Sequence, residues 1–216
     1  MIHIEKLGVY LSRPVAFIVV VIYLLQSALL VYLVNEKFDL EKQVNFQQKR
    51  IAELEEKLQL YKVIEDFQIG FTKEETGQLT SVIYEESKKY HYDPLFLVAV
   101  ILTESSFKKH EVSDSGAIGL MQLRSLAGSS VADLAGVPWK GKQTLMQPEA
   151  NIRLGCAYLF GQILKFKDVK KALVAYNVGE TKLRGLMKDN KPMPHRYLNK
   201  IAELYKNLKE TYTLDT

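Results

Sequence analysis

Glu104 is the first residue whose chemical type and position in the sequence suggest catalysis. It stands just past residues 95–102, a run of Leu, Phe, Val, Ala and Ile that is apolar on every face. A helix of this kind is expected in a protein core, and a carboxylate at its end loses hydration, which raises its pKa. A general acid that works near neutral pH needs such a shift. The alternative is a Glu on the exposed side of the helix end.

Four motifs in order carry a specific resemblance. Residues 104–107 read Glu-Ser-Ser-Phe, residues 113–122 read Ser-Asp-Ser-Gly-Ala-Ile-Gly-Leu-Met-Gln, and residues 175–179 read Ala-Tyr-Asn-Val-Gly. Between them, residues 147–159 contain Gln-Pro-Glu-Ala-Asn-Ile and Gly-Cys-Ala-Tyr-Leu. Over roughly residues 78–208, the chain resembles the soluble lytic transglycosylase family, whose motifs are E-S-x-F/W, S-x-x-G-A-x-G-L-M-Q, D-P-x-x-N-I-x-x-G-x-x-Y-L and A-Y-N-x-G.

The resemblance implies a lysozyme-like helical domain and a specific reaction. Members cleave the β-1,4 bond between N-acetylmuramic acid and N-acetylglucosamine of peptidoglycan and form a 1,6-anhydro ring on the muramic sugar. Ordinary glycoside hydrolysis uses two carboxylates, but Asp114 and Glu111 lie outside the motif letters. Glu104 alone suffices if the substrate supplies the nucleophile. The Glu protonates the leaving oxygen and then takes the proton of the muramoyl 6-hydroxyl as that oxygen attacks C1.

The other residues of the expected site supply hydroxyl, amide, aromatic or thioether groups, and one of them is a glycine. They are Ser113, Gly119, Met121, Gln122, Tyr176, Asn177 and Tyr197. By resemblance, the hydroxyl of Ser113 orients the catalytic carboxylate. The amides of Gln122 and Asn177 suit sugar hydroxyls or acetamido groups. Gly119 either lets the backbone approach a sugar closely or merely makes a turn. Met121 is the weakest member of the set, because a Met between Leu120 and Gln122 more often packs in a core.

Two departures from the family pattern concern substrate binding. Many relatives continue as M-Q-L-M-P where this chain has Met121-Gln-Leu-Arg124-Ser125, so Arg124 replaces a Met that would line the sugar cleft. Tyr197 lies in Pro-His-Arg-Tyr-Leu, which keeps the aromatic residue of the late E-T-x-x-Y-V motif without its Glu-Thr pair. Both departures leave the surroundings of Glu104 intact and leave the substrate preference open.

A long apolar run near the start of the chain predicts a membrane anchor. Residues 15–34 are almost entirely apolar, interrupted only by Gln26 and Ser27, and about 20 such residues span a bilayer core. We therefore expect a short tail over 1–14 and a transmembrane helix over 15–34. A cleaved signal peptide would have a shorter apolar core followed by small residues.

The orientation of this helix is inferred from the substrate, because basic residues on its two sides nearly balance. The expectation is a single-pass protein of the cell inner membrane with its catalytic domain in the periplasm, or otherwise outside the cytoplasm.

Residues 35–69 contain a heptad pattern that predicts a coiled coil or helical spacer. The apolar seam positions are Leu40, Val44, Ile51, Leu54, Leu58 and Tyr61. Through residues 37–65 the chain would pair with a copy of itself or with a partner protein. The alternative is a single amphipathic helix that packs on the following domain.

From Phe71 onward the pattern is repeatedly helical, which predicts a mainly α catalytic domain over residues 70–216. Thr72 and Glu75 form a capping box for a helix through about Lys89, and Asp93 before a Pro is the cap of the apolar helix that ends near the candidate acid.

Composition and motifs exclude several other classes of protein. The 216 residues are 47% hydrophobic and 25% charged, which is typical of a globular chain and not of a disordered one. The single Cys156 rules out an intramolecular disulfide, and the sequence has no nucleotide-binding or zincin motif. We expect no metal, no cofactor and no nucleic-acid partner. Two alternatives to the transglycosylase remain: a lysozyme-like hydrolase that uses water, and a non-catalytic scaffold that binds peptidoglycan.

Overall fold

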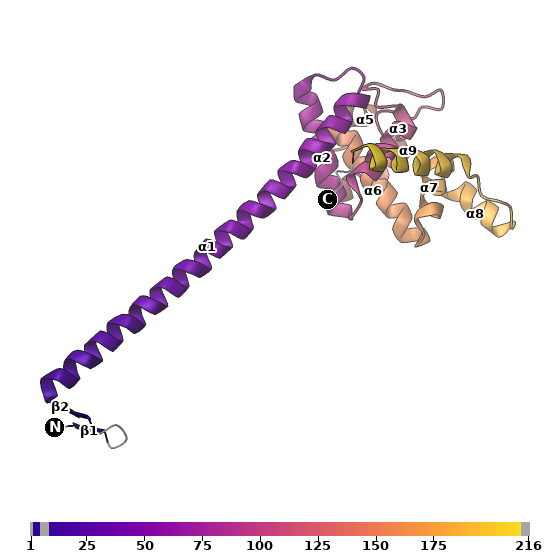
Figure 1. The fold of residues 1–216 in the computed structure, drawn as a ribbon. Coiled ribbons are helices and arrows are strands. Elements are labelled where there is room, and N and C mark those ends of the chain that lie inside the picture. Colours follow the sequence, from indigo (N-terminus) through magenta and orange to yellow (C-terminus); the bar gives the residue numbers. More distant parts are fainter. Residues whose placement is uncertain (1, 5–8, 213–216) are drawn as a thin grey trace. The chain divides into compact units, whose positions relative to one another are not determined.

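The chain is mainly α-helical, as expected. The computed structural model describes residues 2–4 and 9–212, with side chains from residue 12 onward (Figure 1). The elements in chain order are β1 (Ile2–Ile4), β2 (Val9–Leu11), α1 (Arg13–Phe67), α2 (Lys73–Tyr90), α3 (Pro94–Ser105), α4 (Ser125–Ala135), α5 (Lys142–Leu145), α6 (Pro148–Phe166), α7 (Val169–Val178), α8 (Glu180–Lys188) and α9 (Arg196–Tyr212). Two compact units share these elements: residues 1–54 and residues 55–216.

The first unit holds the β1–β2 pair and most of α1. The strands are antiparallel, with Ile2 opposite Leu11, and they lie where the sequence predicts only a short tail. In the described part of the chain, α1 is the one helix long and apolar enough to cross a membrane. Over residues 15–34 its large apolar side chains are exposed all around the helix, as Phe17 and Leu25 illustrate at 70% and 65% exposure.

The second unit begins within α1, at Glu55. The last turns of this helix bury Leu60, Val63 and Ile64 in the core of the unit. The heptad residue Leu58 is on a different face and is 56% exposed. The end of α1 therefore packs as an amphipathic helix on the domain, which is the alternative interpretation for that stretch, and it does so through residues outside the apolar heptad seam.

Two helix starts occur where the sequence predicts them. The Thr72 hydroxyl accepts a hydrogen bond from the Glu75 N–H, and the Glu75 carboxylate accepts one from the Thr72 N–H, which completes the capping box of α2. At the start of α3, Asp93 Oδ1 accepts a hydrogen bond from the Leu95 N–H at 2.8 Å. Both caps satisfy N–H groups that a helix leaves unpaired at its first turn.

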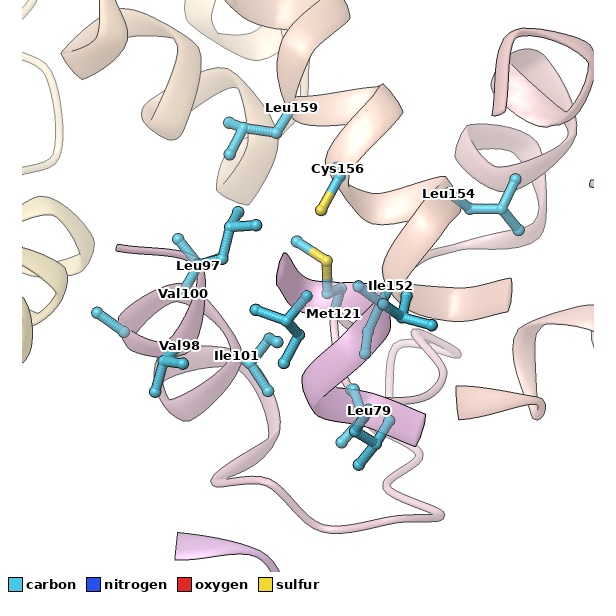
Figure 2. Packing of buried hydrophobic residues seen from close by; sticks show 14 of the residues in the cluster. Leu79, Leu97, Val98, Val100, Ile101, Met121, Ile152, Leu154, Cys156 and Leu159 are labelled. Carbon is cyan, nitrogen blue, oxygen red and sulfur yellow. The ribbon is translucent and has the colours of Figure 1, made fainter. Parts of the chain in front are cut away.

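The core of the second unit surrounds α3 and α6. Every residue of α3 from Leu97 to Leu102 is buried, because this helix packs against α2 and α9. Helix α6 packs against α2, α4 and α7 and contributes Ile152, Leu154, Cys156 and Leu159. Figure 2 shows the Met121 side chain among residues of α3 and α6. This packing fixes the end of α3, where Glu104 lies.

Candidate active site

Glu104 lies in the last turn of α3, next to the Tyr197 side chain of α9. The Tyr197 hydroxyl donates a hydrogen bond to Glu104 Oε1. Nearby, Lys200 Nζ donates to the carbonyl oxygen of Thr103 at 3.1 Å. Because α3 and α9 pack against each other, a hydroxyl far along the sequence reaches the carboxylate and fixes its orientation.

Burial sets the protonation state of this pair. It raises the pKa of Glu104 to about 7, against the smaller opposing effects of the Tyr197 hydrogen bond and the Lys200 charge. Burial, reinforced by the adjacent carboxylate, also raises the pKa of Tyr197 well above its ordinary value, so its hydroxyl stays a donor. Near neutral pH, Glu104 is therefore divided between its acid and base forms, as a group that first gives and then takes a proton requires.

Ser113 lies in the loop between α3 and α4. Its hydroxyl accepts a hydrogen bond from the Ala117 N–H at 3.0 Å and is 3.1 Å from the Ser115 hydroxyl. The Ser113 N–H in turn donates to the Ala117 carbonyl oxygen at 2.9 Å. These bonds make a tight turn at the cleft, and orientation of the Glu104 carboxylate by Ser113 stays a prediction.

Gln122 and Gly119 shape the next turn of this loop. Gln122 Nε2 donates to the carbonyl oxygens of Gly119 and Glu111, at 2.9 and 3.2 Å. Gly119 has a φ of 80°, and a Cβ there would lie 2.7 Å from the Leu145 carbonyl oxygen and would collide with the Asn151 side chain. Glycine is therefore required at 119 for backbone conformation and packing.

Asn151, in α6, holds the same loop from the inside. The side chain is fully buried. Its Oδ1 accepts from the Met121 N–H at 2.7 Å, and its Nδ2 donates to the carbonyl oxygens of Ile118 and Leu145 at 2.8 and 3.0 Å. Asn151 lies in a family motif, but its position in the sequence indicates no role. The structure gives it one, which is to fix the loop that forms the cleft.

Met121 and Tyr176 connect this loop to α7. The Met121 side chain is fully buried, so it packs in the core, which is the second of the two interpretations offered for it. Its carbonyl oxygen accepts a hydrogen bond from the Tyr176 hydroxyl at 2.7 Å. The Tyr176 ring lies 5.5 Å from the ring of Tyr158 in α6, at an interplanar angle of 59°.

A cavity of about 310 Å³ opens beside Glu104. Its lining comprises Glu104, Ser113, Ser115, Ala117, Gln122, Leu123, Arg124, Ala127, Tyr158, Tyr176, Asn177, Val178 and Gly179. Among these described residues, Glu104 is the only carboxylate, and Asp114 and Glu111 are not part of the lining. The cavity thus combines one protonatable acid with hydroxyl, amide and aromatic groups, a set that suits a sugar chain. The described part of the chain holds no cluster of three or more His, Cys, Asp or Glu side chains able to bind a metal ion.

Comparison with known proteins decides the family. A model of the transglycosylase SLT domain matches residues 81–199 of this chain, which is more than half of it. The chain belongs to the SLT domain family. The matched segment of the SLT domain runs from α2 to the start of α9, and so includes both Glu104 and Tyr197.

Curated relatives match the SLT domain over part of their own length. Membrane-bound lytic murein transglycosylase C of Photorhabdus laumondii is 32% identical over 141 residues, which are 59% of this chain and 39% of the relative. Membrane-bound lytic murein transglycosylase E of Buchnera aphidicola is 33% identical over 127 residues, which are 53% of this chain and 59% of the relative. The matched segments thus cover about two fifths of the length of the first relative and about three fifths of the length of the second. A solved structure, that of an inactive mutant of the lytic transglycosylase Slt from Pseudomonas aeruginosa, matches with a TM-score of 0.47 and 27% identity over 59% of this chain and 22% of that one.

The SLT domain brings most of the predicted site residues together. Those that line the cavity are Glu104, Ser113, Gln122, Tyr176 and Asn177. Tyr197 bonds to Glu104, whereas Gly119 and Met121 belong to the framework beneath the cleft. Tyr158 lines the cavity but is absent from the predicted site, although it occupies the tyrosine position of the family's Y-L motif. Its spacing in that motif was the available signal.

Proposed function

We propose that this protein is a membrane-anchored lytic transglycosylase that cleaves the β-1,4 bond between N-acetylmuramic acid and N-acetylglucosamine in peptidoglycan. The observation that carries the proposal is Glu104, the one carboxylate among the described residues of the cavity, with a pKa raised to about 7. Membership of the SLT domain family and the names of the relatives support the same reaction.

One carboxylate can perform both halves of this reaction. Protonated Glu104 gives its proton to the glycosidic oxygen as the bond from that oxygen to muramoyl C1 breaks, and N-acetylglucosamine leaves with a free 4-hydroxyl. The resulting carboxylate then takes the proton of the muramoyl 6-hydroxyl as its oxygen attacks C1. The 1,6-anhydro ring closes and Glu104 is protonated again, so no water is consumed.

Tyr197 assists this cycle as a positioning residue. Its hydroxyl bonds to Glu104 Oε1, which leaves the other carboxyl oxygen for the substrate. A hydrogen bond to the ionised form stabilises the carboxylate that exists between the two proton transfers. Tyr176 and Tyr158 offer ring faces for the sugar, and Asn177, which is exposed in the cavity, offers an amide.

The masses of the reaction products test the proposal. We expect the full chain in detergent to digest purified peptidoglycan into fragments with 1,6-anhydromuramoyl ends, which are lighter by one water than reducing ends. Mass spectrometry distinguishes the two. Reducing ends would identify a lysozyme-like hydrolase, and binding without soluble products would identify a scaffold protein; either result would contradict the proposed reaction.

We propose that residues 15–34 of α1 span the membrane. The exposed apolar surface of this segment supports the proposal, because a helix that is apolar on all faces needs lipid or protein around it. The catalytic domain would then lie on the side of the inner membrane that faces peptidoglycan, in the periplasm or otherwise outside the cytoplasm.

Fractionation of cells checks this anchor. The protein should stay in the membrane pellet through high-salt and alkaline washes. Replacing both Leu24 and Leu25 by Arg should move it to the soluble fraction, because each central Arg costs about 3 kcal/mol on insertion scales. A purified protein whose N-terminal sequence began between residues 25 and 40 would indicate a processed signal and would refute the anchor.

Of residues 37–65, we propose the part ahead of Glu55 as a spacer that also pairs with another helix, since the rest packs on the catalytic domain. At 1.5 Å per residue, residues 37–54 have a length on the order of 27 Å, which would carry an active site toward a glycan layer. Val44, Ile51 and Leu54 are between 47% and 53% exposed. Their exposure supports pairing with a copy of this chain or with a partner protein.

A further inference from the structure

Arg124 is a charged residue in the cavity that the proposed reaction does not use. It immediately precedes α4, and both Arg124 and Ala127 of that helix line the cavity. The side chain is exposed and makes no hydrogen bond that would cap α4. Among the ion pairs of the described residues, none involves Arg124. Its guanidinium is therefore available to a ligand.

Arg124 is also the only cation among the described residues that line the cavity. Glu104, the only acid there, is neutral at the start of the proposed reaction, so the cavity then carries a single positive charge. The raised pKa of Glu104 has its causes in burial, the Tyr197 hydrogen bond and the Lys200 charge. The remaining lining groups are uncharged. The charge of Arg124 is not neutralised by an ion pair among the described residues and would attract an anion.

A carboxylate is the anionic group that a glycan strand of peptidoglycan offers. Only the muramoyl sugar carries one, through the lactyl ether on its 3-oxygen. In a peptide-free strand the lactyl carboxylate is free; in a substituted strand it is joined to a stem peptide that bears further carboxylates. Guanidinium groups bind carboxylates through paired N–H donors in one plane, so Arg can select such a group.

We propose that Arg124 binds a carboxylate of the muramoyl substituent and makes the enzyme prefer acidic over amidated glycan strands. The inference rests on the proposed function, because it takes the cavity as the binding site for a muramoyl sugar. It adds a specificity determinant at a position where the family pattern has Met. The carboxylate source is either the lactyl group or the stem peptide, and the substrates of the test separate the two.

The test measures a substrate preference, defined as the kcat/KM for an acidic strand divided by that for the same strand with its carboxylates converted to amides. One pair of substrates is peptide-free and the other carries stem peptides. With the full chain in detergent, we expect a preference above one for at least one pair. Arg124→Met should lower it about fivefold, within the range of a charged hydrogen bond at a solvent-exposed site. Preference confined to peptide-free strands identifies the lactyl carboxylate; preference confined to peptide-bearing strands identifies the stem peptide.

Two further variants separate a local contact from a general effect of charge. Arg124→Lys should keep part of the preference. Lys142→Met removes one positive charge from the exposed start of α5, outside the cavity, and should leave the preference as in the wild type. High salt should weaken the wild-type preference.

Equal preference of wild type and Arg124→Met on both substrate pairs would overturn the proposal. Failure of the proposed function looks different, because the wild type would then release no anhydro product from any strand. In that case co-sedimentation with acidic and amidated strands decides the proposal: Arg124→Met must bind the acidic strand more weakly than the wild type does, and equal binding refutes it.

Discussion

Replacing Glu104 by Gln should lower the rate of peptidoglycan cleavage by about a thousandfold or more, with binding of glycan strands retained. Gln has nearly the same shape and can still accept the Tyr197 hydrogen bond, but it has no proton to give and cannot take one. Positioned proton transfer contributes about 10²- to 10⁴-fold to a reaction, and here one group serves both transfers. The release of soluble anhydromuropeptides, followed by chromatography, and co-sedimentation with peptidoglycan measure the two properties.

Asp114→Asn is the matched control for this variant. Asp114 lies in the same region of the sequence, is exposed and does not line the cavity, so most activity should remain. Near-wild-type turnover by Glu104→Gln would refute the mechanism. A large loss in Asp114→Asn would show that a second carboxylate takes part, as in two-carboxylate hydrolysis.

The Glu104→Gln variant should also be more stable than the wild type at alkaline pH. The pKa of Glu104 is about 7 in the folded protein against an ordinary value of 4.5, so the folded state binds this proton more tightly than the unfolded state. The stability contributed by the proton is complete below pH 4.5 and is lost as pH rises through 7. Gln pays no such penalty. At pH 8, Glu104→Gln should gain on the order of 2 kcal/mol in free energy of unfolding, whereas at pH 4 the gain should vanish.

Local sequence patterns predicted the parts of this protein that depend on neighbouring residues. The capping box at Thr72, the Asp93 cap and the apolar helix that ends at Glu104 follow from spacings of a few residues. Desolvation of Glu104 also followed, because the apolar run beside it is visible in the sequence. These features are local, so they could be predicted without knowing which helices pack against one another.

Contacts between distant residues escaped prediction from spacing alone. Tyr197 bonds to a carboxylate 93 positions earlier, and only the packing of α9 on α3 brings the two together. The end of α1 illustrates a second limit. It has two apolar faces, the heptad seam with Leu58 and a second face with Val63 and Ile64. The domain surface opposite the second face decides which of the two is buried.

Asn151→Ala should destabilise the protein by about 3 kcal/mol and also impair catalysis. The substitution removes all three hydrogen bonds of the buried amide and leaves the Met121 N–H and the Ile118 and Leu145 carbonyls without this partner. An unpaired buried polar group costs about 1–3 kcal/mol, and partial access of water to the loosened loop offsets some of the sum. Denaturant unfolding of the full chain in detergent measures this loss.

Gln162→Met is the control, because it changes another buried amide of the same helix. Gln162 is 1% exposed, and its Oε1 has no hydrogen-bond partner among the described residues. Replacing this unsatisfied amide by an apolar side chain of similar size should change the free energy of unfolding by less than about 1 kcal/mol. Equal losses in the two variants would mean that helix α6 tolerates no change at buried amides, whatever their hydrogen bonds.

The effect of Asn151→Ala on catalysis follows from what its bonds hold in place. They fix residues 118–121, and the Met121 carbonyl is the acceptor for the Tyr176 hydroxyl, so both the loop and one aromatic wall of the cavity depend on one amide. We expect kcat/KM to fall at temperatures where the variant is still folded, since small displacements of binding groups reduce rates strongly. The pKa of Glu104 should shift little as long as α9 stays packed on α3 and keeps the Tyr197 hydroxyl on the carboxylate. A loss of activity with an unchanged pH profile would therefore mean that the substitution impairs substrate positioning. Full activity in the folded variant would show that the loop keeps its shape without the Asn151 side chain.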